Sequence, residues 1–186
     1  MDILTGFIII WSISLAIWLF YQTNYNEAKT ISNNDELNNK IFAKGIEKSN
    51  EKIEIFDDGN NSEKFNSAYD NEKIIAKLEE KIKTNSKFKV NIKFNFKENL
   101  AINRLLKEYP KQVSIKYNKN NTRNDIDNDE LHFKIFDNGN FCYISKHELN
   151  SSARKIDIYE KNTFGTYHPI VSKYKRQFAE QDKVFS

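Results

Sequence analysis

Alternating apolar and polar residues mark the strands of this chain, most clearly over residues 87–97 (KFKVNIKFNFK). Phe88, Val90, Ile92 and Phe94 alternate there with lysine and asparagine, so one face of the strand is apolar and the other is polar. We therefore predict a central strand whose apolar face is buried. The same alternation predicts shorter strands over 52–56, 112–117, 131–136, 141–145 and 155–160.

Apolar residues at helical spacing predict amphipathic helices between and after these strands. Residues 72–83 place four aliphatic side chains on one face, and residues 98–109 repeat the pattern before a proline ends the helix. A further helix begins at Pro169. An Asn-Gly pair between two alternating segments predicts a hairpin. This order of elements predicts an α/β fold, with α+β as the alternative, in which helices cover a mixed sheet.

The N-terminal part of the chain carries an uncharged, strongly apolar run of 19 residues at positions 3–21. As a helix it is roughly 28 Å long, close to the thickness of a hydrocarbon core, so we predict a single transmembrane anchor. A cleaved signal peptide is the alternative, but no basic residue precedes the run and no small-residue cleavage site follows it. Lysines follow the run and none precedes it. The positive-inside rule therefore favours a cytoplasmic location for the rest of this single-pass membrane protein.

Three regions follow from these patterns: a transmembrane anchor at 1–21, a flexible stalk at 22–50 and a single α/β domain at 51–186. The stalk is predicted because its residues are polar, mixed in charge and rich in asparagine. A short helix around 36–46 also fits the pattern within it.

Composition excludes several functional classes. The 29 basic and 26 acidic residues leave a net charge of +3, which is too small to imply a polyanion partner. The single cysteine, Cys142, excludes a disulfide framework and a cysteine-rich zinc site, and its aromatic neighbours predict a small core residue. Neither a metal nor a cofactor is predicted. One strand face carries four lysines and is predicted to be solvated rather than to bind nucleic acid: Lys87, Lys89, Lys93 and Lys97.

The chain has three histidines, of which His132 offers the most chemistry. His132 and Lys134 are two positions apart on one predicted strand, so their side chains point to the same face. An imidazole held on a strand can attack phosphorus, while a nearby ammonium neutralises the phosphate oxygens. The competing interpretation places both residues on the exposed polar face of a surface hairpin. His147 is predicted to be a surface residue and His168 a helix-entry residue.

The segment 131–150 (LHFKIFDNGNFCYISKHELN) resembles the phospholipase D-like (HKD) family, in which a strand with His-x-Lys is followed by a turn and a second strand ending in Gly-Ser-x-Asn. The likeness is to single-motif, endonuclease-like members, whose two subunits pair to form one site. The order of elements over residues 72–182 fits the family as well. The resemblance implies a homodimeric phosphodiesterase, either a nuclease or a phospholipase, that needs no metal.

The resemblance also assigns roles to residues. It makes His132 the nucleophile, the second half-site's histidine the general acid, and Lys134 a ligand of the phosphate oxygens. The motif is degenerate, because Gly-Ser-x-Asn is replaced by Ser145-Lys146-His147-Glu148 and the family's aspartate has no counterpart at its usual spacing; Asp137 comes too early. The pocket-lining residues that the resemblance implies are Ser145, Lys146 and Glu148, the last an anion where the family has a neutral asparagine.

The rival hypothesis is a non-enzymatic interaction module tethered to a membrane, in which the altered motif is a relic or a coincidence. The position of His132 and Lys134 separates the two hypotheses. A concave pocket shared with Ser145 and Glu148 favours the enzyme, whereas an exposed convex hairpin favours the interaction module.

Overall fold

The structure is a computed structural model that describes residues 3–23, 29–32, 35–57, 71–94, 100–117, 130–147, 154–161 and 168–180. These residues build a seven-stranded sheet with the strand order β1-β7-β6-β5-β2-β3-β4. The strands β2, β3 and β4 are parallel, and the other pairs are antiparallel, so the predicted mixed sheet is confirmed. The strands are β1 (Lys29–Ser32), β2 (Lys52–Asp57), β3 (Lys89–Phe94), β4 (Val113–Tyr117), β5 (Glu130–Phe136), β6 (Phe141–His147) and β7 (Arg154–Glu160).

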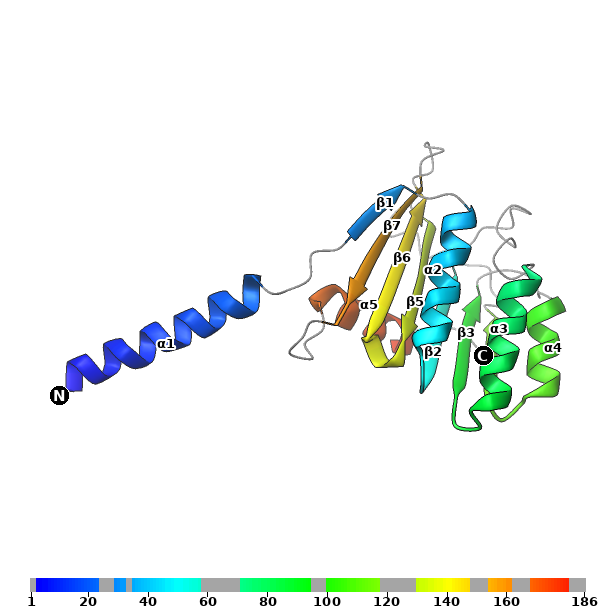
Figure 1. The fold of residues 1–186 in the computed structure, drawn as a ribbon, viewed down its shortest axis with the longest axis horizontal. Coiled ribbons are helices and arrows are strands. Elements are labelled where there is room, and N and C mark those ends of the chain that lie inside the picture. Colours follow the sequence, from blue (N-terminus) through cyan, green and yellow to red (C-terminus); the bar gives the residue numbers. More distant parts are fainter. Residues whose placement is uncertain are drawn as a thin grey trace.

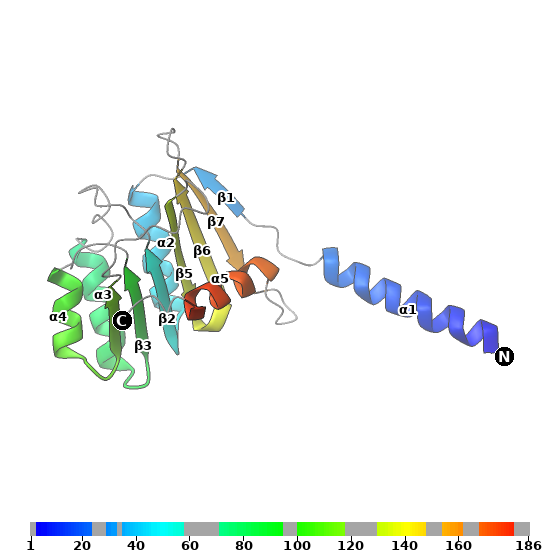
Figure 2. The same cartoon turned by 180° about the vertical axis from the view of Figure 1, so that it is seen from behind.

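Helices cover both faces of this sheet (Figure 1). One face, the three-helix face, packs against α2 (Asp35–Lys48), α3 (Glu72–Thr84) and α4 (Leu100–Glu108). The other face, the α5 face, packs against α5 (Pro169–Glu180), which Figure 2 shows from behind. Because α3 and α4 connect parallel neighbouring strands, both crossovers bring their helices to the same side of the sheet.

The strand that we predicted from alternation is β3, an interior strand between β2 and the edge strand β4, and thus not at the centre of the sheet. Phe88, just before it, and Val90, Ile92 and Phe94 within it are at most 1 % exposed and lie in the core of the three-helix face. The apolar stripe of α3 packs against them, and Asn71 caps the start of that helix by accepting a hydrogen bond from the Lys73 N–H. Periodicity therefore predicted this part of the core correctly.

The segment predicted to be a flexible stalk contains folded elements. In the described part of 22–50, β1 pairs with β7 at one edge of the sheet, and α2 packs on the three-helix face. The buried residues of α2 are few (Ile41, Phe42 and Ile46) among many polar ones, which is why composition suggested a linker. Gly45 lets the helix approach the sheet closely, since a Cβ there would lie 2.4 Å from Cζ of Phe136.

The apolar N-terminal run forms one helix, α1 (Ile3–Thr23), drawn apart from the sheet in Figure 1. Its large side chains are exposed, from Leu15 at 43 % to Trp11 at 73 %. Among the residues that the structure describes, no helix meets the length and apolarity required for a membrane crossing.

The lysine-rich face of β3 is only partly solvated, which corrects the expectation for Lys93. Lys89 is exposed, but Lys93 is only 3 % exposed because the C-terminal half of α5 lies over it. The ammonium of Lys93 donates a hydrogen bond to the carbonyl oxygen of Phe178 and lies 4.0 Å from the centre of that residue's ring. Lys97 lies outside the described residues.

Candidate active site

His132 and Lys134 lie on β5, both directed to the three-helix face of the sheet. Each is only 3 % exposed, so the expectation of an exposed polar hairpin face is wrong for both residues. Two features of the tertiary structure account for this burial. The strand β5 is flanked by β6 and β2, and α2 packs over its polar side. The intervening residues Phe133 and Ile135 are buried on the opposite face, against α5.

Asp57, the last residue of β2, lies directly opposite His132 in the antiparallel pairing of β2 with β5. Its Oδ1 shares a buried hydrogen bond with Nδ1 of His132. Because a carboxylate only accepts hydrogen bonds, we assign the imidazole proton to Nδ1, which leaves the lone pair on Nε2. The pair therefore holds His132 in the tautomer that a nucleophile or base at Nε2 requires.

Sequence reasoning did not identify Asp57 as part of the site. In the sequence, Asp57 is only a polar residue that follows the short predicted strand at 52–56 and precedes Asp58 and Gly59. The signal available was an acidic residue at the end of an apolar strand. That signal has no specificity until the pairing of β2 with β5 is known.

Lys134 occupies an aromatic box on the same face. Its ammonium lies 5.1 Å from the ring centre of Phe42 on α2 and 4.8 Å from that of Tyr143 on β6. Burial lowers the pKa of Lys134 from 10.5 to about 8, although the negative charge of Asp57 partly opposes that shift. At neutral pH Lys134 is therefore still a cation, although its pKa lies close to that pH.

Tyr143 is the second group that the sequence did not reveal. It faces Lys134 across the β5–β6 pair and is fully buried. Its hydroxyl has no hydrogen-bond partner among the described residues. Burial, helped by the charge of Asp57, raises the pKa of Tyr143 well above its usual value, so the phenol remains a protonated donor. A buried donor of this kind costs stability, and such groups often serve function.

Two of the other predicted pocket residues, Ser145 and Lys146, are described only by their backbone. Ser145 is paired with His132 in the β5–β6 register, whereas Lys146 is paired with Leu131, one residue out of phase. Glu148 lies outside the described residues. The role of these three residues in a pocket stays a prediction.

Asp137 serves the fold at the other end of β5. It begins the 3₁₀ helix η2 (Asp137–Gly139), which forms the predicted hairpin turn, and has a positive φ of 45°. Its carboxylate accepts hydrogen bonds from the backbone N–H groups of Asn50 and Glu51 at 2.7 Å and of Lys52 at 3.1 Å. Asp137 therefore ties the β5–β6 turn to the start of β2 instead of acting beside His132.

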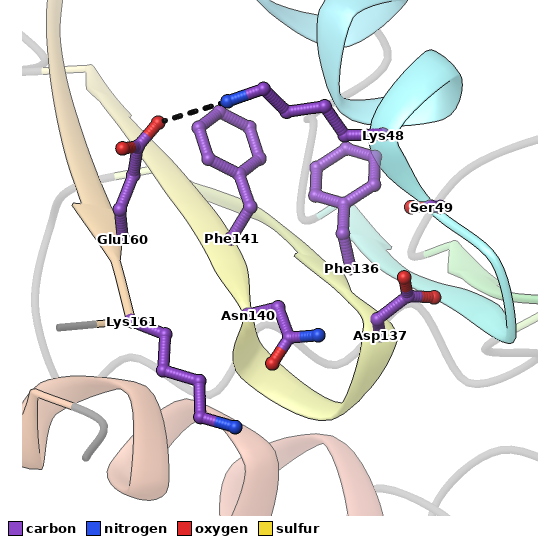
Figure 3. A pocket seen from close by; sticks show the side chains of 8 residues that line it. All are labelled: Lys48, Ser49, Phe136, Asp137, Asn140, Phe141, Glu160 and Lys161. Carbon is purple, nitrogen blue, oxygen red and sulfur yellow. Dashed lines mark ion pairs between the residues drawn. The ribbon is translucent and has the colours of Figure 1, made fainter. Parts of the chain in front are cut away.

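A cavity of about 310 Å³ opens at this turn, separate from His132 (Figure 3). Phe136 and Phe141 form one wall, and Lys48 pairs with Glu160 at 3.6 Å across it. Its charged residues include both signs, and neither His132 nor Lys134 lines it. The cavity is therefore separate from the His132 cluster, which consists of Asp57, His132, Lys134 and Tyr143.

The remaining sequence predictions concern residues outside the cluster. Cys142 is fully buried in the core of the α5 face, as predicted. His168 stands at the entry to α5, as predicted, where its Nδ1 accepts a hydrogen bond from the Ile170 N–H at 3.3 Å. The part of the chain that the structure describes holds no group of three or more His, Cys, Asp or Glu residues suited to a metal ion.

Comparison with known proteins finds similarity at the level of structure. No family model matches the chain, and no curated protein does either. Two similar structures are NucT from Helicobacter pylori (TM-score 0.54, 12 % identity, 86 % of this chain and 97 % of that one) and the phospholipase D family member Nuc from Salmonella typhimurium (TM-score 0.53, 8 % identity, 86 % and 95 %). A third is TrmBL2, an archaeal chromatin protein whose structure shows a novel mode of DNA binding (TM-score 0.56, 13 % identity, 100 % and 69 %).

The resemblance first inferred from residues 131–150 is thus matched by the arrangement of the whole sheet and its helices. At these sequence identities the similarity is one of fold alone. The chain has a phospholipase D-like fold.

Proposed function

We propose that the protein is a phosphodiesterase of the phospholipase D type, with His132 as its nucleophile. The observation that carries the proposal is the buried hydrogen bond between Asp57 and Nδ1 of His132, two residues along the strand from Lys134. This arrangement directs the reactive nitrogen away from the carboxylate and places a cation on the same face. Imidazole attack and charge neutralisation are the two elements that phosphodiester cleavage needs.

In the proposed reaction Nε2 of His132 forms a bond to phosphorus while the bond to the leaving oxygen breaks. A general acid gives that oxygen a proton. A water molecule then attacks phosphorus, the bond between phosphorus and nitrogen breaks, and a proton from the water returns to the general acid. Lys134 and the protonated hydroxyl of Tyr143 stabilise the charge on the phosphate oxygens, and Asp57 stabilises the imidazolium.

The general acid belongs, in this proposal, to a second copy of the chain. The described residues contain one His-x-Lys motif, and a symmetric dimer would supply a second His132 to the same phosphate. Ser145, Lys146 and Glu148 would line the shared pocket. Light scattering tests the dimer directly, and a monomer at assay concentrations that still hydrolyses substrate would contradict it.

The experiment uses the full chain in mild detergent with bis(p-nitrophenyl) phosphate and no added metal. His132→Asn should abolish turnover, and Asp57→Asn should lower kcat strongly because it removes the charge that orients the imidazole. His168→Asn, a histidine outside the cluster, serves as the matched control and should retain activity. Glu148→Asn should raise activity, because it removes an anion from the expected phosphate position.

A non-enzymatic interaction module is the second candidate function. The observation that favours it is the burial of His132 and Lys134, each 3 % exposed, since a substrate must reach Nε2 for the first proposal to hold. One structural neighbour, TrmBL2, is a chromatin protein that binds DNA. Folded wild-type protein and folded Glu148→Asn that both lack turnover would favour the module.

We also propose that α1 attaches the protein to a membrane, with the α/β domain on the cytoplasmic side. The support is an uncharged helix whose large apolar side chains are exposed. The full chain should remain with membranes after a carbonate wash. Release of the intact chain by that wash would refute the anchor, and recovery of a chain without its first twenty-odd residues would indicate a cleaved signal peptide.

A further inference from the structure

Two amide oxygens on α2 are buried without a hydrogen-bond partner. They are the Oδ1 atoms of Asn38 and Asn39, and no described residue donates to either of them. Both side chains are half-buried, so they lie between the solvent and the interior. A buried acceptor that lacks a donor costs stability, and two of them on neighbouring residues indicate a donor that the free protein does not supply.

The buried stripe of α2 shows which way the two asparagines face. Ile41, Phe42 and Ile46 are at most 7 % exposed and pack on the three-helix face of the sheet. Asn38 precedes Phe42 by four residues. Asn39 precedes Phe42 by three residues and Ile46 by seven. Residues at these spacings share one side of a helix, so both asparagines continue the buried stripe toward the start of α2 and face the sheet.

Contacts between α2 and β5 show that both elements run in the same direction. Near the end of α2, a Cβ on Gly45 would meet the ring of Phe136. Three residues earlier, the ring of Phe42 lies 5.1 Å from the ammonium of Lys134, which precedes Phe136 by two residues. A helix rises about 4.5 Å over three residues and a strand about 6.6 Å over two, so both elements advance toward the same end of the sheet.

One further step along both elements brings the asparagines to the level of His132. Asn38 and Asn39 lie about one helical turn before Phe42. His132 lies two residues before Lys134. Side chains on a helix also lean toward its start, which carries the amides further in that direction. The two amide oxygens therefore lie at the His132 end of the cluster, on the helix that covers it.

The chemistry of these oxygens differs from that of the phosphate ligands. The ammonium of Lys134 and the hydroxyl of Tyr143 suit a phosphate oxygen, because both are donors. An amide oxygen only accepts hydrogen bonds, and an ionised phosphodiester has no proton to donate. Asn38 and Asn39 therefore suit a different part of the substrate, namely a hydroxyl group close to the phosphate.

We propose that Asn38 and Asn39 select phosphodiesters that carry a hydroxyl group on the carbon next to the esterified one. The inference rests on the proposed function, because it names the substrate class of the same site. RNA has such a hydroxyl at its 2′ position and DNA lacks it, while a glycerol head group also has one. A substrate without the hydroxyl leaves both buried oxygens unpaired, which is the condition under which a site rejects an analogue strongly.

The test compares substrates that differ only in hydroxyl groups, using the full chain in mild detergent. The first pair is the dinucleotide UpA and its analogue dUpA, which lacks the 2′-hydroxyl beside the cleaved phosphate. The second pair is glyceryl and propyl p-nitrophenyl phosphate, which represents a lipid head group. The wild type should prefer the hydroxylated member by about tenfold or more in kcat/KM. Preference in the first pair identifies a ribonucleotide, and preference in the second pair alone identifies a head group.

Asn38→Leu and Asn39→Leu replace each amide by an apolar group of similar shape, and should lower this preference toward one. A single hydroxyl donates to one oxygen at a time, so the single variants show which asparagine carries the selection. The matched control is Asn91→Leu, a half-buried asparagine on the α5 face of β3, which should retain the wild-type preference. Asn38→Ala and Asn39→Ala, with the same loss of preference, guard against misfolding caused by the larger side chain.

Turnover of both pairs without preference in the wild type would overturn the inference and leave the phosphodiesterase standing. A preference that the α2 variants keep, or that Asn91→Leu loses equally, would also overturn it.

If the protein lacks turnover, calorimetric titration makes the same comparisons. It sets uridine 3′-phosphate against its 2′-deoxy analogue, and glycerol phosphate against propyl phosphate. Tighter binding of a hydroxylated ligand, abolished in the α2 variants, would retain the inference while refuting the phosphodiesterase. Equal binding within both pairs, or no binding, would overturn both.

Discussion

Lys134 and Lys93 are both buried on interior strands of the sheet, one on each face, with the same 3 % exposure. Lys134 lies between two aromatic rings on the three-helix face, with the carboxylate of Asp57 near enough to influence its titration. Lys93 lies on the α5 face, where a carbonyl oxygen accepts its hydrogen bond and a ring lies beneath its ammonium.

The difference shows that burial alone does not define the role of a lysine. Burial lowers the pKa of Lys134 to about 8, so its charge destabilises the fold at neutral pH. Lys93 instead donates to a backbone acceptor and borders a groove, so its charge contributes to a surface. Lys134 has the properties of a functional group that is maintained at a cost in stability, and Lys93 those of a structural cation.

Activity should separate the two lysines most strongly. Lys134→Met should lower kcat/KM for bis(p-nitrophenyl) phosphate, because one charged ligand of the phosphate is lost. The fall should correspond to a loss of about 2–4 kcal/mol of transition-state stabilisation. Lys93→Met, on the other face, should leave hydrolysis of this small substrate unchanged. Steady-state kinetics measures both values. Equal losses in the two variants would mean that the comparison reflects general disturbance of the sheet.

Stability should change with pH because of Lys134. The unfolded chain holds this proton up to pH 10.5, whereas the folded chain releases it near pH 8. Between these values the unfolded state binds more protons, so this residue makes stability rise with pH there. At pH 7 the charged form is present in both states, and Lys134→Met should stabilise the fold by about 3 kcal/mol.

Denaturant unfolding of the wild type and Lys134→Met at several pH values tests this second prediction. The advantage of the variant should shrink as pH rises through 8 and 9. The difference between the two proteins is the relevant quantity, because burial also raises the pKa of Cys142, which both proteins share. A constant difference across this range would contradict the assigned titration.

Lys93→Met should have the opposite effect on stability. It removes the donor to the Phe178 carbonyl and should cost about 1–2 kcal/mol. Lys87→Met, an exposed position just before β3, is the matched control and should stay within about 0.5 kcal/mol of the wild type. Chemical denaturation measures both. Stabilisation by Lys93→Met would show that its charge, too, is held at a cost.

The smallest stability effect is expected for Tyr143→Phe. Its hydroxyl has no partner among the described residues, so its removal should cost less than about 0.5 kcal/mol or stabilise the fold slightly. Tyr117→Phe is the control, because the Tyr117 hydroxyl donates to Asn103 at 2.8 Å and its loss should cost about 1 kcal/mol. If Tyr143→Phe is the more destabilising of the two, Tyr143 has a structural partner and loses its proposed role as a phosphate donor.

Local patterns in the sequence determined much of the fold. The alternation in β3, the helical stripe of α3 and the start of α5 at Pro169 all appear in the structure close to their predicted bounds. Spacing also placed His132 and Lys134 on one face of one strand. These features depend on side-chain direction over a few neighbouring residues, which the period of a strand or helix fixes.

Only the tertiary structure decided what covers each face. The polar side of β5 is buried because α2 packs on it, although the composition of 22–50 suggested a stalk. Lys93 is buried because α5 crosses β3. Asp57 lies 75 residues before His132 in the chain, and only the pairing of β2 with β5 brings the two together. Periodicity is a property of neighbouring residues, whereas burial and charge pairing depend on segments that are distant in sequence, so the chemistry of this site was decided by their packing.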